Sequence, residues 1–386
     1  MKIVVLKFGG TSVGTIEKIK KVTDIIIEHK KKKNKVIVVS SAMSGVTNDL
    51  IKKSKQISNN FIDSEYDVLV SSGEQVACSL IAGRLNHKGF KSRSWLGWQI
   101  PIFTNGPYTN SRIQQVNKNK LLRFLKEGGI PIITGFQGVN MNERVTTIGR
   151  GGSDASAIMI AKSFKAQRCI IYTDVEGVYT TDPNKLKKAK KIKVISYEEM
   201  LEMASLGAKV MQPVSIQDAR LNRINIEVKS SFIKKPGTLI TKRTNLNNNR
   251  IITGISSTHN DAKVTLVGVK DRPGVAASIF KPLSINSINV DMVVQNISPN
   301  GKETDLTFTI KAEDLNKTKK IIQENKSIKF KKVLFQKGVS KISIIGVGMI
   351  TTPGVTFRMF QALANKRINI QVISCLLYTS PSPRDQ

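Results

Sequence analysis

The chain has 386 residues, of which 40% are hydrophobic, so it is long enough to bury the cores of two or three globular domains. Its formal net charge is +33, and the excess is mostly lysine spread along the whole sequence. The densest basic runs, 29–35 and 185–193, lack interleaved aromatic residues. This pattern favours a solvated surface over a nucleic-acid interface. The three cysteines have no disulfide or metal-ligand spacing. The apolar run 3–6 is too short for a signal peptide, and no run approaches the roughly 20 apolar residues of a membrane span. We therefore expect a cytoplasmic protein without membrane contact.

Apolar, strand-like runs alternate with helix-length segments through the first 230 residues. Strands are predicted at 3–6, 36–39, 130–134 and 169–173, and a helix at about 15–30. This alternation is typical of βαβ units and predicts an α/β fold, an αβα sandwich whose open, mainly parallel sheet has helices on both faces.

The amino-acid composition changes after this region. A polar, turn-rich stretch, 233–250, predicts a linker that follows a first domain of residues 1–232. Beyond it, segments 264–298 and 342–374 each read as a strand, a turn ending in Pro-Gly-Val, a helix and an Ile-Asn strand, which indicates an internal duplication. The tail 375–386 breaks the repeat, and we interpret it as an artefact or truncation outside the fold.

The first candidate site is the turn KFGGTS, which contains Lys7, Gly9 and Gly10. Glycines without a Cβ let backbone N–H groups approach an anion, and a helix that follows adds its positive N-terminal end. The lysine precedes the glycines, so the spacing is neither that of a Walker A loop nor that of a dinucleotide fingerprint. Alone, the turn is compatible with an anion site and equally with an ordinary strand-to-helix connection.

Two further loops carry polar groups in a dense arrangement. The run GRGGSD, 149–154, combines three glycines with a guanidinium, a hydroxyl and a carboxylate, and it precedes an apolar helix for which Ser153 is the N-cap candidate. Such a set could hold the carboxylate and the ammonium of an amino acid. The loop 172–183, YTDVEGVYTTDP, follows an apolar strand, where open α/β sheets bind ligands. Each loop also has a purely structural interpretation.

Taken together, these motifs resemble the aspartate kinase (aspartokinase) family of the amino acid kinase superfamily. The resemblance covers the chain up to about residue 374, in family order. The matching pieces are KFGGTSV (7–13), VVSSAMSGVTNDL (38–50), SSGEQVA (71–77), TGFQG (134–138), GRGGSDASA (149–157), YTDVEGVYTTDP (172–183) and KVMQP (209–213). They are followed by a tandem pair of ACT modules, with the first at 251–335 and an incomplete second at 336–374.

The resemblance implies a kinase that transfers the γ-phosphoryl group of MgATP to the side-chain carboxylate of L-aspartate, the first step of lysine, threonine and methionine biosynthesis. It implies an amino acid kinase fold with ferredoxin-like βαββαβ ACT modules. Phosphoryl transfer needs positioning and charge neutralisation, and the attacking carboxylate is already ionised at neutral pH. We therefore expect ATP and Mg²⁺, which arrives with the nucleotide, and no metal site made by the protein alone.

Roles follow from the resemblance residue by residue. The catalytic residues are Lys7 and Asp154, of which Lys7 stabilises the transferring phosphoryl and Asp154 keeps it oriented. The aspartate-binding residues are Thr47, Glu74, Phe136, Arg150 and Ser153, with Arg150 on the α-carboxylate and Glu74 on the ammonium. The ATP-binding residues are Lys7, Phe8, Gly9, Gly10, Thr173, Asp174, Tyr179, Asp182, Lys209 and Val210. Asn184 departs from the family pattern, since many relatives have an arginine there.

Regulation is also implied by the ACT pair. The effector-binding residues would be Asp271, Gly274, Val275, Ala276, Asn289, Gln295, Thr356, Asn369 and Ile370. Lysine, threonine or both are the expected effectors, and a homodimer or an α2β2 assembly through the ACT modules is the expected oligomer. Because the second module is incomplete, we expect weakened feedback inhibition and a tendency to aggregate.

Two alternatives stay open. Another member of the amino acid kinase superfamily would act on glutamate, acetylglutamate or UMP, although the stretches at 38–50 and 71–77 and the ACT pair argue against it. A non-catalytic ACT subunit that only senses amino acids would not need the set Lys7, Glu74, Arg150 and Asp154.

Overall fold

The computed structural model describes residues 2–149, 151–208, 210–242, 251–297, 303–325, 328–346 and 352–374. Arg150, Lys209, the tail 375–386 and the 243–250 part of the expected linker lie outside the described residues. The chain divides into two compact units, Met1–Gly254 and Ile255–Gln386, which we describe separately.

The centre of the first unit is a sheet with eight strands in the described residues, in the order β10-β12-β11-β9-β1-β2-β6-β3. The strands are β1 Ile3–Phe8, β2 Lys35–Ser40, β3 Ser92–Trp95, β6 Ile130–Thr134, β9 Arg168–Thr173, β10 Val194–Ser196, β11 Ile226–Ser230 and β12 Thr238–Thr241. All neighbours are parallel except β11 and β12, which are antiparallel. The predicted open, mainly parallel sheet is confirmed.

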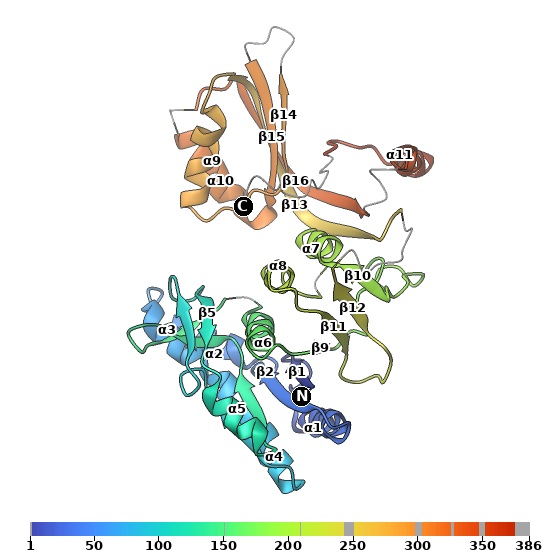
Figure 1. Ribbon diagram of the computed structural model, residues 1–386. Coiled ribbons are helices and arrows are strands. Elements are labelled where there is room, and N and C mark those ends of the chain that lie inside the picture. The colour runs from blue at the N-terminus through green and yellow to red at the C-terminus, as the bar shows by residue number, and fades with distance from the viewer. Residues whose placement is uncertain are drawn as a thin grey trace. The chain divides into compact units, whose positions relative to one another are not determined.

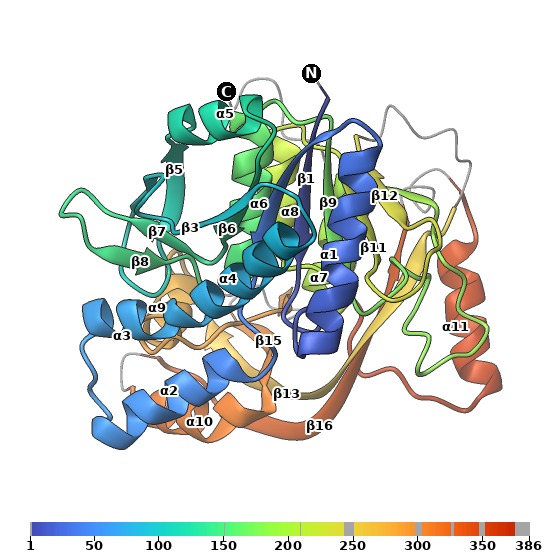
Figure 2. The same cartoon turned by 90° about the horizontal axis from the view of Figure 1, so that it is seen from below.

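Helices cover both faces of this sheet. The helices of the first unit within the described residues are α1 Ile16–Lys31, α2 Val46–Ile57, α3 Asp63–Val70, α4 Ser72–His87, α5 Asn119–Lys126, α6 Gly152–Ser163, α7 Tyr197–Ser205 and α8 Pro213–Leu221. Helices α1 and α4 pack together on one face, whereas α6, backed by α8, packs on β1, β2 and β9 from the other (Figures 1 and 2). The unit is therefore the expected αβα sandwich.

Strand β1 shows how the sequence assigns side chains to the two faces. Leu6 and Phe8 are fully buried in a core cluster with Ile26 of α1 and Ile81 of α4. Because successive side chains of a strand point to opposite faces, Lys7 points to the other face, where α6 lies. A charged residue thus stands between two core residues without disturbing their packing.

A second, smaller sheet adjoins the first in this unit, and the sequence patterns did not predict it. Its order is β5-β4-β7-β8, with β4 Ile102–Asn105, β5 Arg112–Val116, β7 Gln137–Val139 and β8 Val145–Thr147. Strand β8 leads directly into the glycine-rich loop before α6.

The second unit contains a ferredoxin-like fold. Its elements are β13 Gly254–Lys270, α9 Val275–Ile285, β14 Val293–Ile297, β15 Glu303–Lys311, the 3₁₀ helix η2 Ala312–Asp314, α10 Leu315–Glu324 and β16 Lys332–Ile345. The sheet order β14-β15-β13-β16 is that of a βαββαβ module. Apolar residues of α9 and α10 are buried with Phe308 of β15, so the first ACT module has a core of its own.

The second repeat is less complete. It forms α11, Val355–Asn365, but the described residues 368–374 are not in a strand, so the strand expected there is wrong. In the first repeat, β14 is held by its antiparallel neighbour β15, and the described part of the second repeat offers no strand in that place. Ile368 and Ile373 are accordingly exposed.

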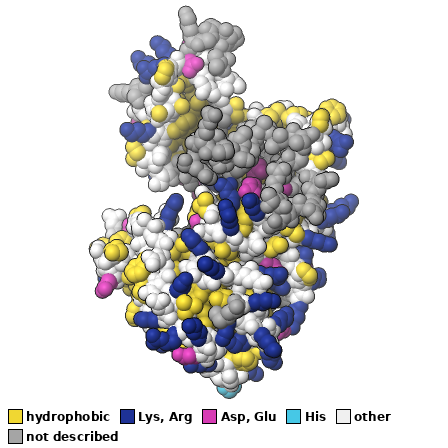
Figure 3. Space-filling model, viewed as in Figure 1, with side chains coloured by type: hydrophobic (Ala, Val, Ile, Leu, Met, Phe, Trp, Pro, Cys, Tyr) yellow, Lys and Arg dark blue, Asp and Glu magenta, His cyan; other side chains and the backbone are white. Residues whose placement is uncertain are grey.

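Surface composition agrees with the sequence. Figure 3 shows Lys and Arg side chains scattered over the visible face, without one dominant patch. No helix among the described residues combines the length and the apolar character needed to span a membrane.

Candidate active site

The turn after β1 lies where several parallel strands end. The Gly9 N–H donates to the Tyr172 carbonyl of β9 at 3.1 Å. A Cβ on Gly10 would lie 2.9 Å from the Ala42 carbonyl oxygen, so the turns after β1 and β2 are in direct contact. The Ser231 hydroxyl, just after β11, donates to Ser12 at 2.6 Å. Open α/β sheets bind ligands at this carboxyl edge.

A buried ion pair joins this turn to α6. The Lys7 Nζ lies 2.6 Å from Asp154 Oδ1, and the two residues are 9% and 7% exposed. Asp154 belongs to the first turn of α6, and the position of a Cβ on Gly9 is 3.6 Å from the Lys7 Nζ. The pair therefore fixes a cation directly above a glycine turn, where it can stabilise a bound anion.

The start of α6 differs from the prediction. Its N-cap is Gly151, in the left-handed conformation with φ of 78°, and Ser153 lies inside the helix. A serine cap requires an extended backbone, whereas a left-handed cap suits glycine. Ser153 instead packs on the end of β6, because a Cβ on Gly135 would lie 2.7 Å from its hydroxyl.

Phe136 is held in an uncommon backbone conformation beside this helix. Its φ is 67°, which is rare for a bulky residue. Its N–H donates to the Ser156 hydroxyl at 3.2 Å, and its carbonyl accepts from the Ile148 N–H at 3.0 Å. Its ring lies against Gly152, 2.9 Å from where a Cβ would be. Such outliers persist where the surroundings impose them, often at ligand sites.

Glu74 supplies a buried carboxyl group on α4. It is 3% exposed, and its Oε1 accepts the Ala42 N–H at 3.1 Å. Its Oε2 has no hydrogen-bond partner among the described residues. Burial raises the pKa of this carboxyl to about 7. A carboxyl group with one unused oxygen is suited to receive a cationic donor.

The loop after β9 adjoins the Lys7 strand, since β9 pairs with β1. The Thr173 hydroxyl donates to Asp174 at 3.0 Å, and Asp182 accepts the Asn184 N–H at 2.9 Å, so contacts within the loop shape it. Val210 is half-buried, and two residues later Gln212 packs on the glycine loop, with its Cγ 2.5 Å from where a Cβ on Gly151 would be.

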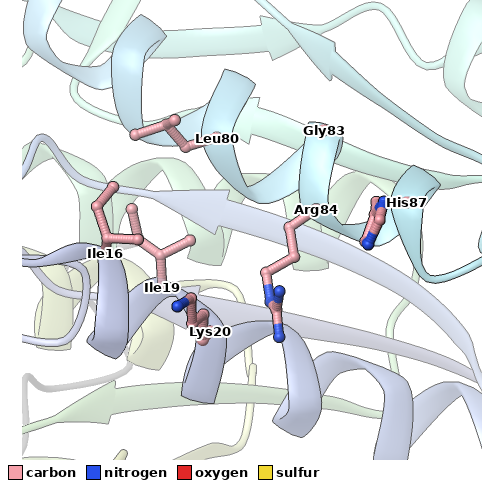
Figure 4. Close-up of a pocket in the computed structure, with 7 residues that line it drawn as sticks. All are labelled: Ile16, Ile19, Lys20, Leu80, Gly83, Arg84 and His87. Carbon is pink, nitrogen blue, oxygen red and sulfur yellow. The ribbon is translucent and has the colours of Figure 1, made fainter.

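A surface pocket lies elsewhere, between α1 and α4 (Figure 4). It is lined by Ile16, Ile19, Lys20, Leu80, Gly83, Arg84 and His87. The Arg84 Nε donates to the Thr23 hydroxyl of α1 at 3.1 Å, so this pocket belongs to the contact between two helices. It lies on the face of the sheet opposite Lys7.

Comparisons with known proteins agree with this geometry. The Amino acid kinase family matches residues 2–230, and the ACT domain matches 264–325 and 342–375. The aspartokinase of Geobacillus stearothermophilus is 42% identical over 374 residues, covering 97% of this chain and 91% of the relative, and the aspartate kinase of Pseudomonas fluorescens is 44% identical over 378 residues at the same coverage. The chain belongs to the aspartokinase family.

Solved structures agree with that membership. E. coli aspartokinase III in complex with aspartate and ADP is similar with a TM-score of 0.80 and 26% identity, covering 98% of this chain and 94% of that one. The same enzyme in complex with lysine and aspartate has a TM-score of 0.79 at the same identity and coverage. Membership in the aspartokinase family makes this chain an ATP-dependent kinase with ACT domains.

The structure places the predicted catalytic and substrate residues that it describes around one edge of the sheet. Lys7 and Asp154 are in contact, Phe136 and Ser153 flank the start of α6, and Glu74 lies against the turn after β2. Thr47, half-buried, is in the first turn of α2 beyond the same turn. Arg150 and Lys209 lie outside the described residues.

The predicted effector residues lie in the second unit. Gly274 is the left-handed N-cap of α9, with Val275 and Ala276 in its first turn. Asp271, Asn289, Gln295, Thr356, Asn369 and Ile370 are exposed. Their role stays a prediction.

Sequence reasoning missed Asp67, a fully buried carboxylate on α3. Its hydrogen-bond donors, Thr109 and Thr147, lie 42 and 80 residues further along the chain. An aspartate in an otherwise ordinary helical run gives no local signal of such distant partners.

Proposed function

We propose that this chain transfers the γ-phosphoryl group of MgATP to the side-chain carboxylate of L-aspartate, giving β-aspartyl phosphate. The observation that carries the proposal is the Lys7–Asp154 ion pair of 2.6 Å, fixed above Gly9 at the carboxyl edge of the sheet. A preorganised cation at this place can stabilise charge on a phosphoryl group in transit, which is the main demand of such a reaction.

Each substrate has its own set of residues in this proposal. Glu74 receives the ammonium of aspartate, Arg150 grips its α-carboxylate, and Thr47, Phe136 and Ser153 complete the pocket. ATP lies against Phe8, Gly9 and Gly10, with its nucleoside part along Thr173, Asp174, Tyr179, Asp182, Lys209 and Val210. Support comes from membership in the aspartokinase family and from the contacts that join the turns after β1 and β2 and the end of β9 at one edge of the sheet.

Mg²⁺ enters as part of the MgATP substrate. Among the described residues no group of three or more His, Cys, Asp or Glu side chains could hold a metal ion. Magnesium is commonly held by substrate phosphates and one or two carboxylates, so the phosphates of ATP would supply most of its ligands here.

The regulatory part of the proposal assigns residues 1–232 to catalysis, together with β12, which lies inside the expected linker 233–250 but is a strand of the central sheet. It assigns 251–335 to the first ACT module and 336–374 to the second. Lysine or threonine would bind at the ACT effector residues, and a homodimer or an α2β2 assembly would form through the same modules, in the cytoplasm. E. coli aspartokinase III in complex with lysine supports lysine as the first effector to try. Titrating activity with lysine and threonine separately measures which one inhibits.

The experiment that tests the catalytic proposal is an aspartate-dependent hydroxamate assay on wild type and Lys7→Ala. Loss of the cation should lower kcat roughly 10²- to 10³-fold, since a preorganised charge is lost from the reacting centre. Lys21→Ala, which removes an exposed lysine from α1, is the matched control and should keep wild-type activity. Equal activity in Lys7→Ala and wild type would refute the proposal.

A further inference from the structure

Asp67 is a buried carboxylate outside the roles assigned above. It lies on α3 with 0% exposure. Its oxygens accept the Thr147 N–H at 2.8 Å, the Thr147 hydroxyl at 2.7 Å and the Thr109 N–H at 3.0 and 3.1 Å. A buried carboxylate is costly unless such donors are maintained, and burial raises its pKa in spite of them. Asp67 therefore fixes the positions of both donor segments.

One donor segment leads straight to the start of α6. Thr147 ends β8, two residues before Gly149, which is left-handed with φ of 73°. A Cβ on Gly149 would lie 2.9 Å from the Asn110 Oδ1, next to the second donor, Thr109. The Ser111 N–H also donates to the Thr147 carbonyl at 2.9 Å. Asp67 thus anchors both the end of β8, from which the glycine loop starts, and the segment of Thr109 that lies beside it.

The other end of this linkage is the helix of Glu74. Only Ser71 separates α3 from α4, and the Ser71 carbonyl accepts the Gln137 Nε2 at 2.9 Å. Glu74 follows in the first turn of α4. The short segment from Asp67 to Glu74 consequently connects the start of the glycine loop with the buried carboxyl group described above.

We propose that Asp67 is a positioning residue that sets the distance between Glu74 and the loop leading to Ser153, and thereby the fit of the aspartate site. The inference rests on the proposed function, in which these two segments hold the ammonium and the carboxylate of one substrate. Asp67 touches neither substrate. Its loss should weaken aspartate binding while ATP binding is retained, because the side-chain hydrogen bonds of Asp67 within the described residues go to Thr109 and Thr147, which are not in the proposed ATP segments.

The test measures KM for aspartate and KM for ATP separately in Asp67→Asn. The amide keeps the shape of the side chain but turns one acceptor into a donor facing N–H groups. We expect KM for aspartate to rise about tenfold or more, in line with the loss of buried hydrogen bonds to a charged group, and KM for ATP to change less than about twofold. Glu65→Gln is the matched control, because it removes an exposed ion pair with Arg144 from the same helix and should leave both constants unchanged.

A second pair of variants keeps the proposal testable if Asp67→Asn does not fold. Thr147→Val removes the hydroxyl donor and should raise KM for aspartate alone, whereas Thr147→Ser retains the donor and should restore the wild-type value. A lower thermal midpoint with both KM values unchanged, or an equal rise of both, would overturn the positioning role. Wild-type chain that fails to phosphorylate aspartate would instead overturn the proposed function.

Discussion

Glu74 combines a functional advantage with a structural cost. Its carboxyl group is almost completely buried, and the Oε2 has no partner among the described residues, so the ionised form is poorly solvated. Burial raises its pKa from the ordinary 4.5 to about 7. The ammonium group of a bound substrate would compensate the ionised form, and in the proposed function this favours amino acids as substrates.

The first prediction concerns pH and aspartate binding. If Glu74 receives the ammonium of aspartate as proposed, it does so in its ionised form. The kcat/KM for aspartate should then fall as pH decreases below about 7, approaching tenfold per pH unit well below that value. In Glu74→Gln the kcat/KM for aspartate should be low and nearly independent of pH between 6 and 8. The measurement is the pH profile of both proteins, and a profile of wild-type shape in Glu74→Gln would contradict the role.

The second prediction concerns stability at the same residue. Because the pKa of Glu74 is raised in the folded chain, the folded chain binds more protons than the unfolded chain between pH 4.5 and 7, and the free energy of unfolding decreases as pH rises through this window. Glu74→Gln should remove this loss of folding stability, because the amide does not titrate, and should raise the free energy of unfolding of the first unit above pH 7 by up to about 3 kcal/mol. Thermal unfolding at pH 5 and pH 8 measures it, and destabilisation at pH 8 would contradict it.

At the scale of elements, two glycines of the first unit allow a matched comparison. Gly10 lies in the turn after β1, where an added Cβ would meet the Ala42 carbonyl at 2.9 Å, a backbone atom that cannot move aside cheaply. Gly83 lies within α4, where an added Cβ would meet nothing within 4 Å. The same substitution should therefore have opposite effects at the two positions.

The third prediction follows from this comparison. Gly10→Ala should destabilise the chain by about 1–3 kcal/mol and lower kcat/KM for ATP, because the turns after β1 and β2 must separate. Gly83→Ala should stabilise it by about 0.5–1 kcal/mol through helix propensity and leave activity unchanged. Urea unfolding and steady-state kinetics measure both, and equal behaviour of the two variants would contradict the close contact.

Elements with a strong periodic pattern were predictable from the sequence. The apolar strand at β1, the helix that begins after Thr15 and the buried strands β2, β6 and β9 appear where the pattern places them. The small sheet was missed because β7 and β8 have three residues each, too few to show alternation. The strand expected at 368–374 was wrong for a different reason, since a strand also needs a hydrogen-bonded neighbour, and the described residues of the second repeat supply none.

The candidate site was predictable in part. Motifs identified Lys7 and Asp154, but only the fold shows that the two groups touch at 2.6 Å. Glu74 lies against the turn after β2, where its neighbour Gly73 is in close contact with Ala42, and only the fold brings these segments together. Asp67 could not be identified, because its partners become neighbours only after the small sheet forms.

At the scale of the whole molecule, charge gives the fourth prediction. The chain carries a net charge of +33, whereas ATP and aspartate are both anionic, so its field should speed their encounter. Raising salt from about 50 to 500 mM should lower kcat/KM for ATP several-fold while kcat at saturation stays nearly constant. Sucrose at matched osmolality is the control, and kcat/KM that is independent of salt would contradict the steering.

Strand β16 has a consequence for the second unit as a whole. Its first residues complete the sheet of the first ACT module, and the same unbroken strand runs on to Ile345, inside the second repeat that begins near residue 342. The two repeats therefore share strand β16, and no linker separates them. A cut between the two repeats would have to pass through this strand, so we expect them to be exchangeable only as one piece.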